Sequence, residues 1–168
     1  MDIFELIEHR KSVRSYKPDP VEPGKLKKIL EAGVLAPSAK NQQEWRFIAV
    51  TDPELQKKVA EGCFYNTFIA KAPATIVVCT GEDYTMRCGV PARPVDASIA
   101  MTHMIYAAEA LGLSTCWIGS FDEPVIRELL NVPPTHKIVA LTPLGYAGKE
   151  GRPRSRKAFD EVVSYNGF

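Results

Sequence analysis

The chain has 168 residues, of which 45% are hydrophobic, with 13 prolines and 11 glycines. This composition predicts one folded domain with a real core and many short elements. The formal net charge of +1 provides no strong field for nucleic acid, so we expect no nucleic-acid partner. Four cysteines without a C-x-x-C pair disfavour a metal site and suit a reducing compartment. We expect neither a signal peptide nor a membrane span, and therefore a cytoplasmic protein.

The first part of the chain is predicted to be helical. Asp2 followed three residues later by Glu5 resembles a capping box, and the apolar residues after it predict a helix over residues 2–10. Apolar residues at helical spacing predict a second amphipathic helix over residues 23–36.

Strands and helices alternate further along the chain. We expect strands over residues 46–51, 75–80, 114–120 and 137–146, and helices over residues 53–62, 95–111 and 123–131, with a helical turn at residues 66–71. The run from Thr75 to Thr80 is uncharged and β-branched, which is typical of a central strand buried on both faces. Pro143 indicates a bend or an edge position in the last strand. The helix over 95–111 is apolar on most sides, so it should be buried, in part at a subunit interface.

This order of elements predicts an α+β fold. We expect a three-layer α/β/α domain with a central mixed, mainly antiparallel sheet of four to five strands. Residues 1–168 should form one domain, with residues 148–168 as a C-terminal extension. That tail is basic and then partly amphipathic, so we expect it to pack on a dimer partner. The chain lacks G-x-G-x-x-G and G-x-x-x-x-G-K-[ST], so it offers neither a Rossmann site nor a P-loop.

Two polar segments point to a ligand. APSAKNQQEW (residues 36–45) places three amides together, and each amide both donates and accepts hydrogen bonds. HRKSVRSY (residues 9–16) is dense in cations and hydroxyls. The first segment suits a planar heterocycle, although it also fits a plain polar turn, and the second suits a phosphate. A flavin nucleotide has both of these ends.

Four motifs in order resemble the FMN-dependent nitroreductase family, which is NAD(P)H:flavin oxidoreductase-like. HRKSVRSY is similar to R-R-S-x-R-x-F, APSAKNQQEW to A-P-S-x-x-N-x-Q-P-W, LGLSTCWIGSF (residues 111–121) to L-G-L-x-x-x-W-I-G, and RPRSRK (residues 152–157) to a closing K-x-R phosphate clamp. The resemblance covers nearly the whole chain. It implies a homodimer with FMN at the interface. It also implies two-electron transfer from NADH or NADPH through FMN to a small oxidised acceptor of nitroaromatic or quinone type, alternately at one site, which is a ping-pong mechanism.

The resemblance also assigns cofactor-binding residues. Those for the phosphate are Arg10, Lys11, Ser12, Arg14, Arg154 and Arg156; those reaching the flavin from the partner subunit are Pro37, Ser38, Ala39 and Asn41; those beside the ring are Asn66, Trp117, Ile118 and Gly119. Arginine forks bind a phosphate dianion through charge-assisted hydrogen bonds. Asn66 has a helix N-cap as its alternative role. Backbone N–H groups at 117–119 can hydrogen-bond near flavin N5.

No side-chain catalytic residue is expected, because flavin N5 carries the hydride and the protein holds and tunes the cofactor. Glu44 and Lys11 stand where the family often has proline and arginine, and Ile69 stands where some relatives place a lysine near the flavin. The loop 81–94 is short for a substrate lid, which indicates a more open pocket.

Three other functions are weighed beside this one. The chain could be a flavin-binding carrier or redox sensor with little turnover. A specialised branch of the family, for reductive dehalogenation or flavin fragmentation, finds no support in the loop 81–94. A small nucleic-acid module using the basic tail is disfavoured by the near-zero net charge.

Overall fold

The computed structural model describes residues 2–64, 66–153 and 155–168. Its helices are α1 (Ile3–His9), α2 (Pro23–Val34), α3 (Pro53–Glu61), α4 (Ala92–Ala110) and α5 (Glu123–Leu129), with short 3-10 turns η1 (Ala39–Asn41), η2 (Thr67–Lys71) and η3 (Phe159–Glu161). Its strands are β1 (Trp45–Val50), β2 (Ala74–Thr80), β3 (Ser114–Thr115) and β4 (Lys137–Gly145). The predicted α+β class is confirmed.

The four strands form one sheet in the order β1-β2-β4-β3, and each neighbouring pair is antiparallel. An isolated parallel bridge between Ser12 and Thr115 adds the only parallel pairing among the described residues. The sheet is therefore mixed and mainly antiparallel, as predicted. Every residue of β2 is buried, because this strand has neighbours on both edges and helices on both faces.

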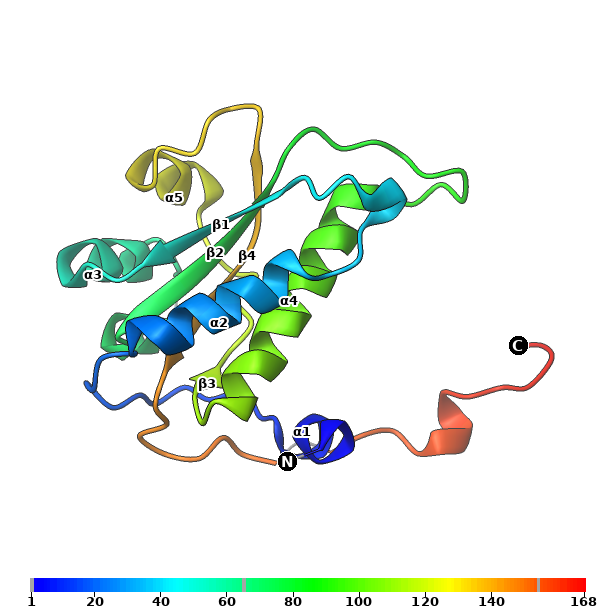
Figure 1. Ribbon diagram of the computed structural model, residues 1–168, viewed down its shortest axis with the longest axis horizontal. Helices are drawn as coiled ribbons and strands as arrows, with labels where there is room; N and C mark the ends of the chain where they lie inside the picture. The colour runs from blue at the N-terminus through cyan, green and yellow to red at the C-terminus, as the bar shows by residue number, and fades with distance from the viewer. Residues whose placement is uncertain (1, 65, 154) are drawn as a thin grey trace.

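Helices cover both faces of the sheet, with α2 and α4 on one side and α3 and α5 on the other (Figure 1). Successive residues of β2 point to opposite faces because a strand has a period of two. Ile76 and Val78 accordingly belong to the core under α2 and α4, whereas Val77 and Cys79 belong to the core under α3 and α5. This arrangement confirms the three-layer prediction.

The longest helix begins earlier than the sequence pattern indicated. α4 starts at Ala92 rather than at Val95, with Pro91 as its N-cap residue. The first N–H groups of a helix have no intrahelical partner, so Pro94 in the first turn removes no hydrogen bond. At the other end Gly112 has φ +73°, the left-handed conformation that a glycine cap supplies.

The strand expected over residues 114–120 is wrong in its length. β3 contains Ser114 and Thr115 alone, and a single bridge joins Ile118 to Leu141. The edge position expected for Pro143 is also wrong, because β4 lies between β2 and β3. The ladder with β3 is interrupted beside Pro143, where a proline has no N–H to contribute.

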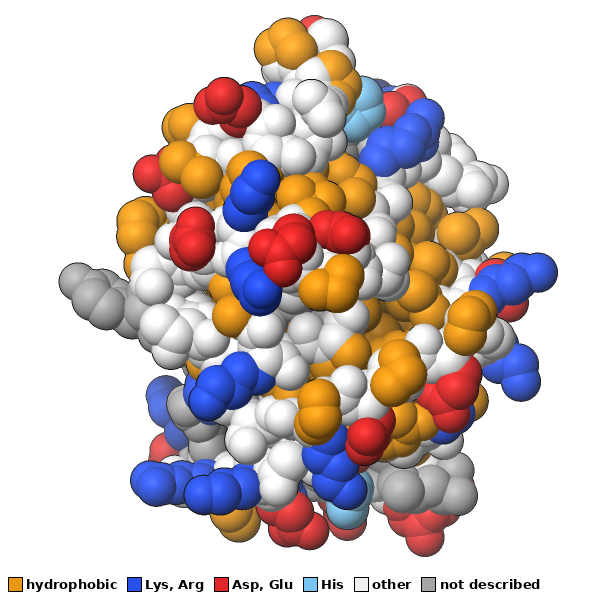
Figure 2. All heavy atoms as spheres, turned by 90° about the vertical axis from the view of Figure 1, so that its left-hand side faces the viewer, with side chains coloured by type: hydrophobic (Ala, Val, Ile, Leu, Met, Phe, Trp, Pro, Cys, Tyr) orange, Lys and Arg blue, Asp and Glu red, His pale blue; other side chains and the backbone are white. Residues whose placement is uncertain are grey.

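The molecular surface over α3 and α5 mixes hydrophobic side chains with charges of both signs (Figure 2). None of the helices in the described residues combines the length and apolar character needed to cross a membrane. Beyond Gly148 the chain leaves the body of the domain (Figure 1), and Phe159, Val162 and Tyr165 are exposed. The packing of this tail on a partner stays a prediction.

Candidate functional site

The basic segment near the N-terminus is placed by α1 and β3. The predicted capping box starts α1: Asp2 accepts from the N–H of Glu5 at 2.9 Å, and the Asp2 N–H donates to Glu5 at 2.7 Å. The helix ends at His9, and Arg10 follows in a non-helical conformation. The chain then runs along β3, where the Val13 N–H donates to the Thr115 carbonyl at 2.9 Å. Residues 10–15 therefore lie along the β3 edge of the sheet.

The start of the C-terminal tail meets this segment and forms a cleft of about 650 Å³ with it. We call it the basic cleft; its lining residues are Ser12, Arg14, Ser15, Lys149, Glu150, Gly151, Arg152 and Pro153. The Gly148 N–H donates to the Ser15 carbonyl at 2.7 Å. A Cβ on Gly151 would come within 2.9 Å of the Ser12 carbonyl oxygen, so glycine permits this close approach. Two segments distant in sequence thus make one site.

Charge in the basic cleft is mainly positive. Arg14, Lys149 and Arg152 line it, and one carboxylate, Glu150, lies 3.7 Å from the Lys11 ammonium. Arginine and lysine donors around a hydroxyl are the groups that bind a phosphate. Ser12 and Arg14 come from the predicted set, whereas Lys149 and Arg152 were not singled out by the sequence. Their signal was present, because Arg152 opens the basic motif RPRSRK.

The remaining predicted phosphate residues lie apart from the lining of the cleft. Arg10 and Lys11 are half-buried beside it. Arg156 is exposed and donates to the Ser155 carbonyl at 3.3 Å. Arg154 lies outside the described residues.

Tyr16 follows the basic segment and is buried beneath it in the core. Its hydroxyl donates to the Val13 carbonyl at 2.9 Å, and its ring is buried. Burial raises the pKa of Tyr16 far above its usual range, so the phenol stays protonated and remains a donor. It therefore fixes the turn that carries Arg14.

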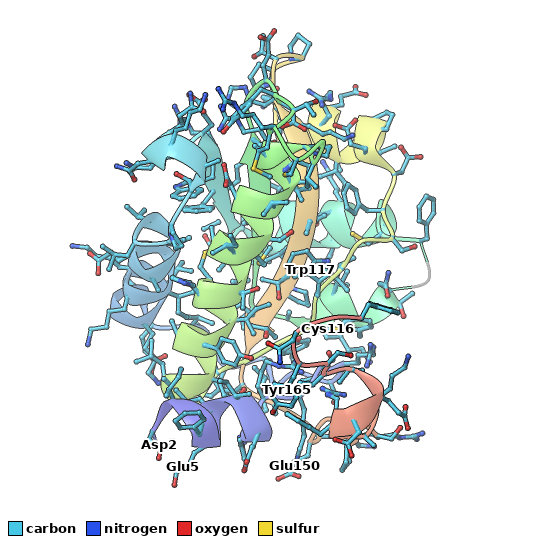
Figure 3. All side chains as sticks on the ribbon, turned by 90° about the vertical axis from the view of Figure 1, so that its right-hand side faces the viewer. Asp2, Glu5, Cys116, Trp117, Glu150 and Tyr165 are labelled. Atoms are coloured by element: carbon cyan, nitrogen blue, oxygen red, sulfur yellow. The ribbon has the colours of Figure 1, made fainter. Side chains whose placement is uncertain are left out.

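Trp117, Ile118 and Gly119, which are predicted to lie beside the flavin ring, follow β3 and run next to β4. Ile118 is buried and exchanges two hydrogen bonds with Leu141, at 2.8 and 3.1 Å. The Ile118 N–H is therefore used within the sheet and is not available to a ligand. Trp117 is 40% exposed. In Figure 3, Cys116 and Trp117 lie on the segment beside α4, above Glu150.

Asn66 joins this region through its side chain. Its amide nitrogen donates to the Cys63 carbonyl at 2.9 Å and to the Ser120 carbonyl at 3.3 Å. It makes no side-chain cap to η2, so the alternative role as an N-cap is not what its side chain does. Asn66 and Gly119 are thereby held close together.

The other predicted flavin residues lie in a loop after α2. Its backbone is left-handed at Lys40, Asn41 and Gln43, with φ of 54°, 55° and 53°. The Gln43 N–H donates to Ser38 Oγ at 3.0 Å, and the Gln43 side chain donates to Asn41 Oδ1 at 3.1 Å. We call residues 38–43 the amide loop. The clustering of amides expected from the sequence is present.

The amide loop is fastened to the first turns of α4. The Ala39 N–H donates to Asp96 Oδ1 at 2.9 Å, and Arg93 donates to Gln42 Oε1 at 3.1 Å. Arg93 and Asp96 are themselves buried and 3.5 Å apart. The sequence did not point to Arg93, because the predicted helix began after it.

The basic cleft and the amide loop lie at opposite ends of α4 (Figure 1). Asp96 holds the amide loop, whereas Glu109 contacts His9 of α1 at 2.6 Å. Asp96 and Glu109 are thirteen steps apart along α4, which is about 20 Å at 1.5 Å per residue. One chain therefore does not bring both halves of the predicted site together.

Three of the four thiols belong to the core. Cys63, Cys79 and Cys116 are buried and Cys88 is exposed. Burial raises the pKa of Cys63 and of Cys79 to about 11, so neither is a thiolate at neutral pH.

Comparison with known proteins identifies the class. The nitroreductase family model matches residues 7–65 and 60–146. An NADH dehydrogenase of Thermus thermophilus is 30% identical, over 92% of this chain and 91% of its own length. A Bacillus subtilis FMN reductase [NAD(P)H] is 34% identical, over 78% of this chain and 59% of its own length.

Solved structures agree with the sequence comparison. A nitroreductase family protein of Clostridium difficile superposes with a TM-score of 0.91 at 30% identity, covering 100% of both chains. An FMN-dependent nitroreductase of the same species gives a TM-score of 0.86 at 30% identity, covering 99% of this chain and 100% of its own. The chain belongs to the nitroreductase family, and it is an enzyme.

Proposed function

We propose that the protein is an FMN-dependent oxidoreductase that takes two electrons from NADH or NADPH and passes them to a small oxidised acceptor of nitroaromatic or quinone type. The observation that carries this proposal is the basic cleft, which offers guanidinium, ammonium and hydroxyl donors to a phosphate. The names of the Bacillus subtilis FMN reductase and the Clostridium difficile FMN-dependent nitroreductase support the same cofactor.

The residues of this chain fit the two ends of FMN. Ser12, Arg14, Lys149 and Arg152 are the donors that would hold the phosphate. Arg10, Lys11, Arg154 and Arg156 would add charge around it. Toward the ring, Asn66, Trp117, Ile118 and Gly119 would form a wall, on which Gly119 has no side chain to obstruct the ring.

FMN supplies the redox chemistry when it is bound, accepting two electrons from the pyridine nucleotide and releasing them to the acceptor. The protein contributes binding, orientation and electrostatic tuning. Donor and acceptor would use the same exposed side of the site in turn, by a ping-pong mechanism. The partly exposed Trp117 supports a pocket that is open enough for both.

The site would be completed by a second copy of the chain. The turn of α4 that holds the amide loop lies about 20 Å along the helix from the turn that contacts α1, so Pro37, Ser38, Ala39 and Asn41 would reach the flavin bound by the partner. The outward side of α4 supports a homodimer, because Val95 and Ile99 line a shallow apolar groove there. Residues 148–168, with Phe159 and Val162 exposed, would extend over the partner. Four cysteines, none of them in a disulfide among the described residues, support a cytoplasmic location.

The first experiment is a visible absorption spectrum of the purified protein, followed by NADH or NADPH without oxygen. We expect a flavin spectrum that bleaches with one or both nucleotides, and the faster reaction identifies the donor. An oxidised acceptor should then restore the flavin spectrum. In steady-state kinetics, double-reciprocal plots of rate against nucleotide concentration at several acceptor concentrations should be parallel. A flavin that stays oxidised would favour a carrier or redox sensor. Failure to take up added FMN would refute the proposal.

A further inference from the structure

The Arg93–Asp96 pair occupies a place that charged side chains rarely take. The side chains are 6% and 5% exposed. Arg93 donates from Nε to the Glu82 carbonyl at 3.1 Å and from Nη2 to Gln42 Oε1 at 3.1 Å. The Arg93 guanidinium also lies over the Tyr84 ring, 5.0 Å from its centroid. One buried arginine thus contacts the amide loop, the loop 81–91 before α4, and Asp96 on its own helix.

Stability alone does not account for this arrangement. Buried ion pairs recover their desolvation cost only when every donor and acceptor is satisfied. Arg93 Nη1 and Asp96 Oδ2 lie 3.5 Å apart. Within the described residues, neither atom has a hydrogen-bond partner. A pair of apolar residues would fill the same space without this cost. A buried polar pair of this kind is retained in some proteins because it specifies one conformation.

The conformation being specified is a strained one. Lys40, Asn41 and Gln43 all have φ near +55°, which L-residues with a Cβ adopt at a cost. Such strain persists only where the surroundings determine it, and it gathers at binding sites. The two contacts from α4, Asp96 to the Ala39 N–H and Arg93 to Gln42, hold the amide loop on both sides of Lys40 and Asn41.

We infer that Arg93 and Asp96 are positioning residues that hold the amide loop in its left-handed conformation, so that its small residues and amides are ready to receive a flavin ring. This inference rests on the function proposed above. The pair acts through Ala39 and Gln42 and does not itself touch the cofactor. A loop that is already ordered loses less entropy on binding, so the pair should appear in the FMN affinity.

The α5 arginine provides a matched control. Arg127 forms an ion pair with Glu123 on its own helix and donates to the carbonyls of Val132, Pro133 and His136. It therefore fastens a loop to a helix by the same chemistry; it lines one cavity with Arg93, but its hydrogen bonds go to residues 123 and 132–136 and not to the amide loop. Arg93→Lys and Arg127→Lys each keep one charge and remove one guanidinium fork.

The test measures FMN affinity and amide exchange in the full-length protein. Asp96→Asn and Arg93→Lys should each weaken FMN binding about tenfold, whereas Arg127→Lys should stay within about twofold. Hydrogen–deuterium exchange of the FMN-free protein should speed up over residues 38–43 in the first two variants only. Gln42→Ala, at an exposed position, is a milder variant that leaves the buried pair intact and should weaken binding less.

Each outcome decides the inference. Faster exchange together with weaker FMN binding supports it. Faster exchange with unchanged FMN affinity overturns it, because the held conformation would then not serve the flavin. Unchanged exchange also overturns it, as does equal weakening of FMN binding in Arg127→Lys, which would indicate a general loss of structure. If the unmodified protein does not bind FMN, the proposed function itself has failed, and the inference fails with it.

Discussion

The two ends of α4 solve the problem of holding a ligand in opposite ways. At its C-terminal end, the basic cleft gathers Arg14, Lys149 and Arg152, which are exposed to solvent. At its N-terminal end, the amide loop is held by a buried ion pair and a strained backbone. The basic cleft therefore relies on charged side chains that are exposed to solvent. The amide loop relies on shape that is fixed before any ligand arrives.

This difference has consequences for substitution. Exposed charges act over long distances, are screened by salt and replace one another at a modest cost. In a buried ion pair, the removal of one partner strongly destabilises the fold, because the other partner is left charged and unsatisfied. We therefore expect changes at the basic cleft to alter ligand binding, and changes at the Arg93–Asp96 pair to alter the fold as well.

The largest effect on stability should come from Asp96→Ala. It leaves the buried Arg93 guanidinium without a counter-charge and the Ala39 N–H without its acceptor, at a cost of about 3–5 kcal/mol in the free energy of unfolding. The matched change Glu123→Ala should cost about 1 kcal/mol or less, because that pair is partly exposed, with side chains 26% and 30% accessible. Urea denaturation measures both. Equal losses would contradict the contrast between a buried and an open pair.

The elements of the fold that depend on local pattern could be predicted from the sequence. The run from Thr75 to Thr80 identified the central strand, and the capping box identified α1, because these signals are contained within a few neighbouring residues. The start of α4 was missed, since prolines at 91 and 94 end helices as often as they begin them. The predicted strand over residues 114–120 was too long, because a β-branched or aromatic run does not reveal where the hydrogen bonds to the next strand are interrupted.

The candidate site divides in the same manner. Ser12 and Arg14 were identified by residue type within a motif, and they do line a cleft. The choice among the basic residues of the tail was not determined by sequence, since it depends on where a glycine lets the tail approach residue 12. Arg93 could not be found by composition either. Its role comes from contacts with residues 42 and 82, which only the tertiary fold brings together.

At the basic cleft, Arg14→Ala should weaken FMN binding about 10- to 100-fold, because a charge-assisted hydrogen bond contributes about 1.5–3 kcal/mol. The fold should be unaffected, since the Arg14 side chain is exposed. Lys28→Ala removes the same charge from an exposed position on α2 and should leave the affinity unchanged. Fluorescence titration with FMN provides the measurement. A Lys28 variant as weak as the Arg14 variant would show that net charge alone, rather than the cleft, determines binding.

Salt should have a smaller effect on FMN binding, and this effect should arise at the basic cleft. Raising the ionic strength from about 0.05 to 0.5 M should weaken FMN binding about fivefold, because exposed charges are screened over this range. Riboflavin, which lacks the phosphate, should bind more weakly throughout and show almost no salt dependence. Parallel titrations with the two ligands test this directly. If riboflavin responds to salt as FMN does, the phosphate does not bind through exposed cations.

The smallest effect belongs to Glu22, an exposed carboxylate just before α2. The Tyr146 hydroxyl donates to Glu22 at 2.7 Å, and this hydrogen bond, with help from Lys25, lowers the pKa of Glu22 from 4.5 to about 2. A lowered pKa in the folded state stabilises the fold above pH 4.5, and this contribution is lost as the pH falls from 4.5 towards 2. Glu22→Gln should therefore be less stable than the unmodified protein at pH 6, by an amount that shrinks towards pH 2. Tyr146→Phe should reproduce this loss by removing the donor, as urea midpoints at several pH values can show. A stability difference that does not change with pH would mean that Glu22 contributes through packing instead of charge.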